Sequence, residues 1–315
     1  MRRFLAAIAG LCLIATGSLA FYQSRDSNYN QNIAASGGGY TGPGDVVSGA
    51  YAWWGLRCYN NAYSGLVADI TDASSGNTTG TRLQCSSGTV SAVVSGSACT
   101  FVTGNACSSL ATTCASSCNV VTLYDQSGAS NCTGPCNMAQ ASNGARPTVM
   151  VSCLNSHPCM VFNGTSHLLQ TPNPASSQIQ PYTMSGVAER TGNTSVFADI
   201  IGANTNAVQF LFNSGANQFT LYAGSVASPV TANDSAYHAI QGVYNGSSSI
   251  IYVDGTQTTG LSAGASALGN TAPIILGAGN NYLTGNIAEA GIWPIGLNTT
   301  QQSNMNSNQH TYWGF

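Results

Sequence analysis

The sequence predicts an all-β protein, a β-sandwich of stacked antiparallel sheets stapled by disulfides. Three observations predict it. Short β-prone runs follow one another from Ser64 to Trp293, and glycine, asparagine and serine fill almost every gap between them. Only one later segment, Asn298 to Asn308, carries a helix signal, with Asn298 or Thr299 as its cap. Ten cysteines also crowd into residues 58–159.

The N-terminus, residues 1–20, is predicted to be a secretory signal peptide. Arg2 and Arg3 precede the apolar stretch Phe4 to Ala15, and Ser18-Leu19-Ala20 is a small-x-small cleavage site. The alternative is an uncleaved membrane anchor, but the apolar stretch is shorter than the roughly 20 residues of a spanning helix. No later segment is apolar enough to cross a membrane. We therefore expect a secreted or extracellular protein; the alternative locations are the periplasm and the cell surface.

The mature chain is expected to begin with a linker and continue as one domain. Residues 21–45 are rich in serine, asparagine, glycine and tyrosine, which is typical of a flexible linker. Residues 46–315 are then predicted to be a single β-sandwich, because strands from both halves of such a sandwich usually pair with each other. The stretch Val46 to Tyr63 is either a short helix or a first strand.

The predicted strands are recognised by apolar and β-branched residues between turn residues. They cover 66–70, 89–94, 120–124, 160–162, 182–188, 208–212, 219–223, 237–244, 249–253, 273–276 and 285–293. Asp254-Gly255 after the run 250–253 is a strong hairpin signal.

The cysteine count indicates disulfides. Of eleven cysteines, Cys12 leaves with the signal peptide, and an even number in an exported chain predicts five bridges. Close spacing favours three local pairs, leaving four cysteines to pair among themselves. The local pairs are Cys114/Cys118, Cys132/Cys136 and Cys153/Cys159, and the remaining four are Cys58, Cys85, Cys99 and Cys107. The x3 spacings also resemble zinc-ligand spacing, but an oxidising destination favours disulfides over zinc.

Charge is scarce, which excludes several partners. Only 5% of residues are charged, lysine is absent, and the net charge is −3. Nucleic acid needs clustered basic residues, which this chain lacks. A surface of hydroxyl and amide side chains suits neutral glycans. The four histidines have neither metal nor triad spacing, and no phosphate-binding glycine loop is present, so we expect no metal and no cofactor.

Two motifs carry a resemblance to a known family. The segment Tyr124-Asp125-Gln126-Ser127-Gly128 can form a tight polar corner after a buried strand. Together with the upstream stretch Arg57 to Gly65, it resembles the catalytic domain of glycoside hydrolase family 54, the α-L-arabinofuranosidases. That resemblance implies a concanavalin-A-like jelly-roll sandwich and the hydrolysis of terminal α-L-arabinofuranosyl groups in polysaccharide. The same corner also occurs in non-catalytic laminin-G-like and lectin-like sandwiches, which the order of the last runs, from Ile250 to Trp293, resembles too.

The catalytic carboxylates that the resemblance implies are missing. The family's nucleophile is a glutamate in an Asp-x-Glu-Asn stretch, for which residues 210–223 are the expected counterpart, and they hold no carboxylate. The family's acid/base aspartate follows a Leu-Gly-x-Gly turn. Here Leu276-Gly277-Ala278-Gly279 is followed by Asn280, and an amide cannot transfer the proton.

Other residues are candidates for the site. Glu189 and Asp199 are the candidate catalytic pair, because a hairpin across Gly192-Asn193 would bring them together. The alternative for Glu189 is an ion pair with Arg190 or a solvated strand end. Asp125 is expected to form hydrogen bonds within the corner, and Glu289 to be structural.

Trp53, Trp54 and Asn280 are the candidate substrate-binding residues. Sugar rings have apolar faces on which an indole can stack, although core packing is the simpler alternative for each tryptophan. Two functions therefore remain open. One is an arabinofuranosidase-type glycoside hydrolase; the other is a non-catalytic, lectin-like module that binds an arabinose-containing polysaccharide or another neutral glycan.

Overall fold

The computed structural model describes most of the chain from residue 39 onward. The described residues are 39–72, 81–94, 97–100, 118–192, 195–203, 207–213, 218–227, 230–231 and 235–315. The predicted signal peptide and most of the predicted linker lie outside them. One compact unit spans Gly37–Phe315. Among the described residues, no helix combines the length and the apolar character needed to cross a membrane.

The described elements are mostly short strands. Those before the middle of the chain are α2 (Pro43–Val46), β1 (Ala52–Gly55), β2 (Leu66–Asp72), β3 (Thr81–Ser86), β4 (Thr89–Val94), β5 (Ser97–Thr100), β6 (Cys118–Leu123), β7 (Met138–Ala139), η1 (Asn143–Ala145), β8 (Thr148–Leu154), β9 (His157–Asn163) and β10 (Leu169–Gln170). The later ones are β11 (Tyr182–Arg190), β12 (Ala198–Ala203), β13 (Val208–Phe212), β14 (Gln218–Tyr222), β15 (Val230–Thr231), β16 (His238–Tyr244), η2 (Gly246–Ser248), β17 (Ser249–Val253), β18 (Thr256–Leu261), β19 (Ile275–Leu276), β20 (Thr284–Trp293) and α4 (Thr299–Trp313).

These strands pair antiparallel in two sheets. The first runs in the order β18–β17–β16–β11–β20, and the other edge of β20 pairs with β1 and with β9. The second runs β15–β14–β13–β12–β19–β10–β7. Strand β6 pairs with β7 of the second sheet and with β8, which pairs with β9, so β6 links the two sheets. Strands β2 to β5 extend from β6 as an antiparallel ribbon. The predicted β-sandwich is therefore confirmed.

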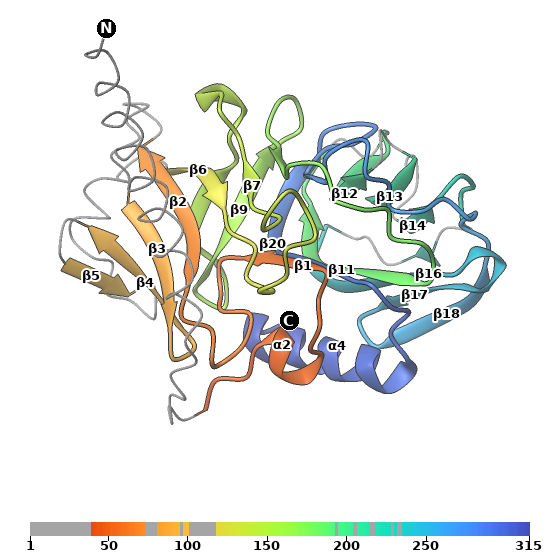
Figure 1. Cartoon of the computed structure of the whole chain (residues 1–315), viewed down its shortest axis with the longest axis horizontal. Helices are drawn as coiled ribbons and strands as arrows, with labels where there is room; N and C mark the ends of the chain where they lie inside the picture. Colours follow the sequence, from red (N-terminus) through yellow and green to blue (C-terminus); the bar gives the residue numbers. More distant parts are fainter. Residues whose placement is uncertain are drawn as a thin grey trace, which may run out of the picture. The chain divides into compact units, whose positions relative to one another are not determined.

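Two glycines mark where the sheets face each other. A side chain added at Gly186 on β11 would meet Ile200 and Phe210 of the second sheet, and one at Gly242 on β16 would meet Leu221. Buried apolar side chains from both sheets form one core cluster there. Figure 1 shows β12, β13 and β14 on one side of the sheet that holds β11, β16 and β20, with α4 on the opposite side.

Helix α4 begins at the predicted cap and continues past the predicted end at Asn308 to Trp313. The Asn298 side chain accepts a hydrogen bond from the Gln301 N–H (3.0 Å), and the Gln301 side chain accepts one from the Asn298 N–H (3.0 Å). Gly314 stops the helix at φ 76°, a left-handed conformation that favours glycine. The helix lies on the outer face of the first sheet, where Gln241 donates to the Gln302 carbonyl (2.9 Å).

The end of the predicted linker is part of the folded domain. Pro43–Val46 forms helix α2, and the Asn308 amide of α4 donates to the Thr41 carbonyl (2.7 Å). The Tyr40 hydroxyl donates to the Cys58 carbonyl. Residues 40 and 41 of the predicted linker thus contact the segment after β1 and α4. Val46 to Tyr63 supplies both the helix end and the strand that were alternatives.

Three disulfides are described. Cys132–Cys136 and Cys153–Cys159 are two of the predicted local pairs, and Cys58–Cys85 joins two of the four remaining cysteines. Cys114 of the predicted Cys114/Cys118 pair lies outside the described residues. Cys58–Cys85 closes a separation of 27 residues, so it stabilises the fold by about 3–4 kcal/mol in the chain-entropy account.

Candidate functional site

The predicted polar corner is built around a buried carboxylate. Asp125 accepts hydrogen bonds at Oδ1 from the N–H groups of Trp53 (3.0 Å) and Ser127 (2.9 Å), and at Oδ2 from that of Cys136 (3.3 Å). Burial raises the pKa of Asp125, and these N–H groups oppose the rise. The corner-forming role predicted for Asp125 is confirmed, and its carboxylate serves to hold β1.

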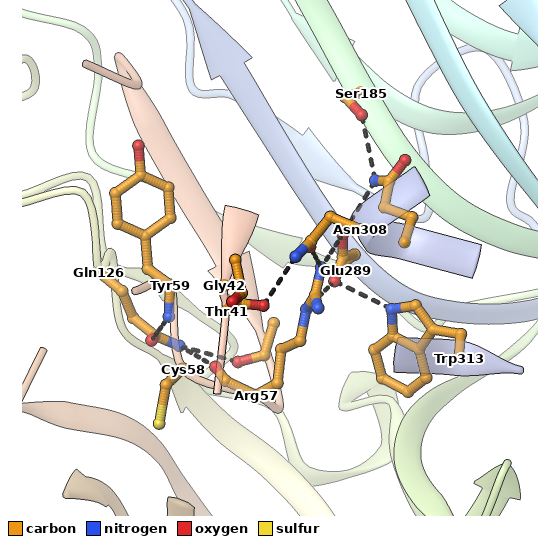
Figure 2. Close-up of polar contacts among 12 residues, drawn as sticks. Thr41, Gly42, Arg57, Cys58, Tyr59, Gln126, Ser185, Glu289, Asn308 and Trp313 are labelled. Carbon is orange, nitrogen blue, oxygen red and sulfur yellow. Dashed lines mark hydrogen bonds and ion pairs between the residues drawn. The ribbon is translucent and has the colours of Figure 1, made fainter. Parts of the chain in front are cut away.

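The side-chain amide of Gln126, next to Asp125, holds the backbone of the second motif, which begins at Arg57. Gln126 accepts at Oε1 from the Tyr59 N–H (3.0 Å) and donates through Nε2 to the carbonyls of Gly55 (3.0 Å) and Arg57 (3.0 Å). These bonds hold the backbone from Gly55 to Tyr59, as Figure 2 shows, with the Arg57 side chain directed toward Glu289 of β20. The two motifs thus form one structural unit.

Arg57 and Glu289 form a buried ion pair. Nε of Arg57 donates to Oε2 of Glu289, and Nη2 donates to Oε1 (3.0 Å). Glu289 also accepts from Nε2 of Gln309 (2.9 Å) and from the indole N–H of Trp313 (3.0 Å), both on α4. Figure 2 shows the bond from Trp313. The Arg57 side chain is 0% exposed and that of Glu289 is 1% exposed. All this hydrogen bonding and burial makes Glu289 structural, as predicted.

The Arg57 guanidinium also packs on an aromatic stack. It lies 4.5 Å from the ring centroid of Tyr312, whose ring stacks on the His157 imidazole at 4.1 Å. Burial lowers the pKa of His157, and the charge of Arg57 lowers it further. The folded protein therefore favours the neutral imidazole in this stack.

Acid should weaken the fold at His157. A histidine whose folded pKa lies below its unfolded value of about 6.5 contributes stability above that value, and loses it as the pH falls through and below 6.5. We expect the stability of the wild type relative to His157→Phe to fall between pH 7.5 and pH 5, because phenylalanine keeps a stacking ring that cannot be protonated. Urea unfolding midpoints of both proteins measure this difference, in which the contributions of His167 and of Asp199, whose raised pKa acts in the opposite direction, cancel. A difference that does not change with pH would contradict this assignment.

The two candidate tryptophans lie in the core. Trp54 is 0% exposed and its indole N–H donates to the Cys136 carbonyl (2.7 Å). Trp53 is 1% exposed and packs with Tyr59 and Trp293 in a small cluster beneath α4. Neither ring has a face open to a sugar, and core packing, the simpler alternative, accounts for both.

Glu189 and Asp199 do not form a hairpin pair. Strand β11, which holds Glu189, pairs with β16 and β20, whereas β12, which holds Asp199, pairs with β13 and β19 in the other sheet. The hairpin prediction is wrong because the chain after β11 crosses between the sheets instead of turning back beside β11. Glu189 is half-buried and accepts a hydrogen bond from the Asn286 amide (3.0 Å).

Asp199 occupies an unusual position. Its side chain is 0% exposed. Oδ2 accepts hydrogen bonds from the backbone N–H groups of Asn280 (2.8 Å) and Asn281 (3.4 Å), in the turn after β19. Oδ1 is buried and has no hydrogen-bond partner among the described residues. Burial raises the pKa of Asp199 to about 7, although the two N–H groups and Gln209 lower it in part.

Gln209 is the neighbour that sequence reasoning missed. It lies on β13, two residues before Leu211, so the side chains of Gln209 and Leu211 point to the same face of the second sheet. Asp199 on β12 pairs with Leu211 and therefore lies on that face as well. Gln209 is 6% exposed, and its amide lies close enough to the Asp199 carboxyl to lower the pKa of that group. An uncharged glutamine in a β-prone run gives no sequence signal, because only the register of β12 and β13 brings it to Asp199.

The turn after β19 fits tightly over this carboxyl. A side chain added at Gly279 would approach the Asp199 carboxyl carbon to 2.6 Å, so only glycine allows the close approach. The candidate Asn280 is exposed and contributes its backbone N–H. The structure therefore brings together two of the predicted site residues, Asp199 and Asn280, and leaves Glu189, Trp53 and Trp54 elsewhere.

Three of the four described arginines lie inside the protein. Of the described arginines, Arg57, Arg146 and Arg190 are buried, whereas the side chain of Arg82 is 52% exposed and pairs with Asp69. No group of three or more histidine, cysteine, aspartate or glutamate side chains in the described part of the chain is arranged to hold a metal ion. The described surface is thus mainly neutral and polar.

Comparison with known proteins agrees with this architecture. Residues 163–301 match the family model described as the concanavalin A-like lectin/glucanases superfamily. This part of the sandwich is thus similar to concanavalin A-like domains, as the sequence motifs imply. A comparison with curated protein sequences found no match.

Solved structures of glycoside hydrolase family 54 share the fold. One is a variant α-L-arabinofuranosidase of this family soaked with 4-nitrophenyl α-L-arabinofuranoside, with a TM-score of 0.62 and 14% identity. Another is an arabinofuranosidase complexed with arabinofuranosyl-α-1,2-xylobiose, with a TM-score of 0.62 and 15% identity. Each alignment covers 85% of this chain and 65% of the other, so this chain aligns with less than two thirds of their length.

Proposed function

We propose that this protein is an exported carbohydrate-binding protein that recognises a neutral, arabinofuranosyl-bearing glycan without hydrolysing it. The observation that carries the proposal is a carboxylate and an amide side by side on one face of the second sheet, Asp199 and Gln209, next to the turn that holds Asn280. A carboxylate and an amide together offer the acceptor and the donor that sugar hydroxyls bind.

A sugar hydroxyl has the required chemistry. Its oxygen accepts a hydrogen bond from an amide N–H while its proton is donated to a carboxylate oxygen. The neutral surface suits such a ligand, since most described arginines are buried. The choice of arabinofuranosyl groups is supported by the shared fold, because the two solved structures above carry arabinofuranosides.

The local sequence argues against retaining hydrolysis. A retaining glycosidase needs two carboxyl groups about 5–5.5 Å apart. The strand that lies beside the Leu276–Asn280 turn is β12, which pairs Ile201 with Leu276. When Asp199 is aligned with the aspartate of the family's Asp-x-Glu-Asn motif, Ile201 occupies the position of the nucleophilic glutamate. Asn280 occupies the position of the acid/base aspartate. This alignment replaces residues 210–223 as the counterpart of the family's stretch.

Export is supported by the N-terminal pattern and by the disulfides. Residues 1–20 have the features of a signal peptide. Disulfides such as Cys58–Cys85 persist in oxidising compartments.

An arabinofuranosidase is the second candidate function, and one observation favours it. A carboxyl group with a pKa of about 7, as burial gives Asp199, is suited to general acid–base catalysis near neutral pH. This function would need a second carboxylate beside Asp199.

One pair of assays separates the two functions. The full chain, purified after export, is run on native gels containing arabinoxylan and incubated with 4-nitrophenyl α-L-arabinofuranoside. We expect retardation by arabinoxylan, lost in Asp199→Asn or Gln209→Ala, and no release of nitrophenol. Asp69→Asn is the matched control, because that carboxylate pairs with Arg82 on β3. Nitrophenol release that Asp199→Asn abolishes would establish the enzyme instead, and unretarded migration would refute glycan binding.

A further inference from the structure

The hairpin between β8 and β9 is closed by a disulfide. Cys153 on β8 and Cys159 on β9 are 6 residues apart in the chain. The ladder of the hairpin is irregular just before Leu154, where the bridge lies. The turn residues Asn155 and Ser156 both have positive φ (47° and 61°), which is uncommon for residues other than glycine. The bridge therefore holds together a hairpin tip whose backbone pairing is discontinuous.

The tip of this hairpin contacts the C-terminal end of α4. The side-chain amide of Asn155 donates a hydrogen bond to the Tyr312 carbonyl (3.1 Å). The His157 imidazole stacks on the Tyr312 ring, with 4.1 Å between the ring centroids. A side chain added at Gly314 would approach Cβ of Asn155 to 3.0 Å, so the end of the helix lies directly against the tip.

The bridge itself packs against the last turn of α4. Cys159 and Trp313 belong to one buried apolar cluster with side chains of the first sheet, and Cys153 packs against that cluster. The Trp313 indole N–H in turn donates to Glu289 (3.0 Å). The position of the last turn of α4 thus depends on the closed hairpin.

Cys153 is the accessible end of this bridge. It is half-buried, whereas Cys159 and the four cysteines of the other two described bridges are buried. A thiolate must reach a sulfur to exchange with a disulfide, so access decides which bridge reacts. The Tyr237 hydroxyl lies 2.7 Å from Sγ of Cys153 and also bonds to Glu189. Because a disulfide sulfur has no proton, this hydroxyl is the donor, and it can equally donate to a thiolate formed there.

We propose that Cys153–Cys159 is a thiol–disulfide exchange site, at which a dithiol reductant opens the hairpin and releases the last turn of α4 from the first sheet. A thiolate of the reductant attacks Sγ of Cys153, the S–S bond breaks, and its electron pair leaves on Sγ of Cys159, which takes a proton from solvent. The second thiol of the reductant then displaces Sγ of Cys153. The protein gains two electrons and two protons, and the reductant leaves as a disulfide. This inference is independent of the proposed glycan binding.

Limited reduction shows which bridge reacts. The full chain, purified after export, is treated with dithiothreitol at pH 8 without denaturant, quenched with iodoacetamide and digested for mass spectrometry. We expect Cys153 and Cys159 to be alkylated at least about 10-fold faster than the cysteines of the other two described bridges, because buried sulfurs react only after local unfolding.

Hydrogen exchange of the selectively reduced protein, followed by NMR, reports on α4. The Gly314 N–H donates to the His310 carbonyl (2.8 Å), so its exchange follows the last turn of the helix. Reduction should speed this exchange by about 10-fold or more, because the bridge no longer closes the short loop that holds the tip. The Gln302 N–H, which donates to the Asn298 carbonyl (2.9 Å) in the first turn, should keep its rate.

Two double variants make the test specific. Cys153→Ser with Cys159→Ser should show the fast exchange at Gly314 without any reductant. Cys132→Ser with Cys136→Ser is the matched control and should not, because that bridge lies at the polar corner, where the Cys136 N–H donates to Asp125.

The possible outcomes separate the two parts of the inference. Reduction of another described bridge first, or at an equal rate, would overturn the exchange site. An unchanged rate at Gly314 after selective reduction would overturn the release of the helix. Both measurements are made on the wild type, so the test holds even if a variant folds poorly. Neither outcome bears on retardation by arabinoxylan, which tests the proposed function separately.

Discussion

Replacing Glu289 by alanine should destabilise the domain by about 3–5 kcal/mol, because the change leaves the Arg57 cation buried without its partner. Gln309 and Trp313 lose the same acceptor. Since these donors tie α4 to β20, we also expect the helix to loosen. Equilibrium unfolding in urea with the disulfides intact measures the loss, and hydrogen exchange along α4 shows where it occurs.

Two further variants make this prediction specific. Glu189→Gln is the matched control, because Glu189 is half-buried and its hydrogen-bond partners, Asn286 and Tyr237, are neutral; it should change the unfolding free energy by less than about 1 kcal/mol. The double variant Arg57→Met with Glu289→Leu removes both charges and should cost less than Glu289→Ala alone. A loss below about 1 kcal/mol in Glu289→Ala would show that the ion pair does not hold the helix.

Asp199→Asn should raise the unfolding free energy at alkaline pH, whereas Glu289→Ala lowers it. Burial raises the folded pKa of Asp199 from 3.8 to about 7, so the folded state takes up a proton relative to the unfolded state. The penalty is absent below pH 3.8, grows as the pH rises toward 7 and is constant above it. Three pKa units correspond to about 4 kcal/mol. Asparagine avoids the charge and can still accept the turn N–H groups, so we expect a gain of about 2–4 kcal/mol at pH 8 and almost none at pH 4.

Unfolding midpoints of both proteins from pH 4 to pH 8 measure this gain. Asp69→Asn, which removes a partly exposed carboxylate, should show no such rise. A gain for Asp199→Asn alongside loss of glycan binding would mean that stability is sacrificed at the ligand site, a common trade-off. If Asp199→Asn were equally or less stable than the wild type at pH 8, the ionised carboxylate would be well accommodated and its raised pKa would be contradicted.

The strand pattern was readable from the sequence where side chains are apolar over several residues. The run 208–212 matches β13, and 249–253 matches β17, because a fully buried strand of a sandwich shows as a continuous apolar run. Strand β12 was missed, since Asp199 and Gly202 interrupt its apolar residues. The hairpin turn predicted at Asp254-Gly255 is confirmed, and both residues have positive φ. Aspartate and glycine tolerate this conformation better than most residues, which is why the pair is a turn signal.

The candidate site was predictable only in part. The polar corner at Asp125 and the helix cap at Asn298 are local, so side chains reach backbone groups a few residues away and the pattern is visible in the chain. Glu189 was paired with Asp199 on sequence proximity, which failed because the chain crosses from one sheet to the other between them. Trp53 and Trp54 carry no sequence mark that distinguishes a core ring from an exposed one.

By itself, the sequence determined the all-β class, two of the local disulfides, the polar corner and the C-terminal helix, because each depends on residue type and short spacing. Only the tertiary structure decided that Glu289 is neutralised by Arg57, 232 residues away along the chain, and that Asp199 lies with Gln209 under the turn at Gly279. The physical reason is burial: a carboxylate's ionisation and hydrogen bonding depend on which distant strands surround it, and the registers of those strands are set by the packing of the two sheets.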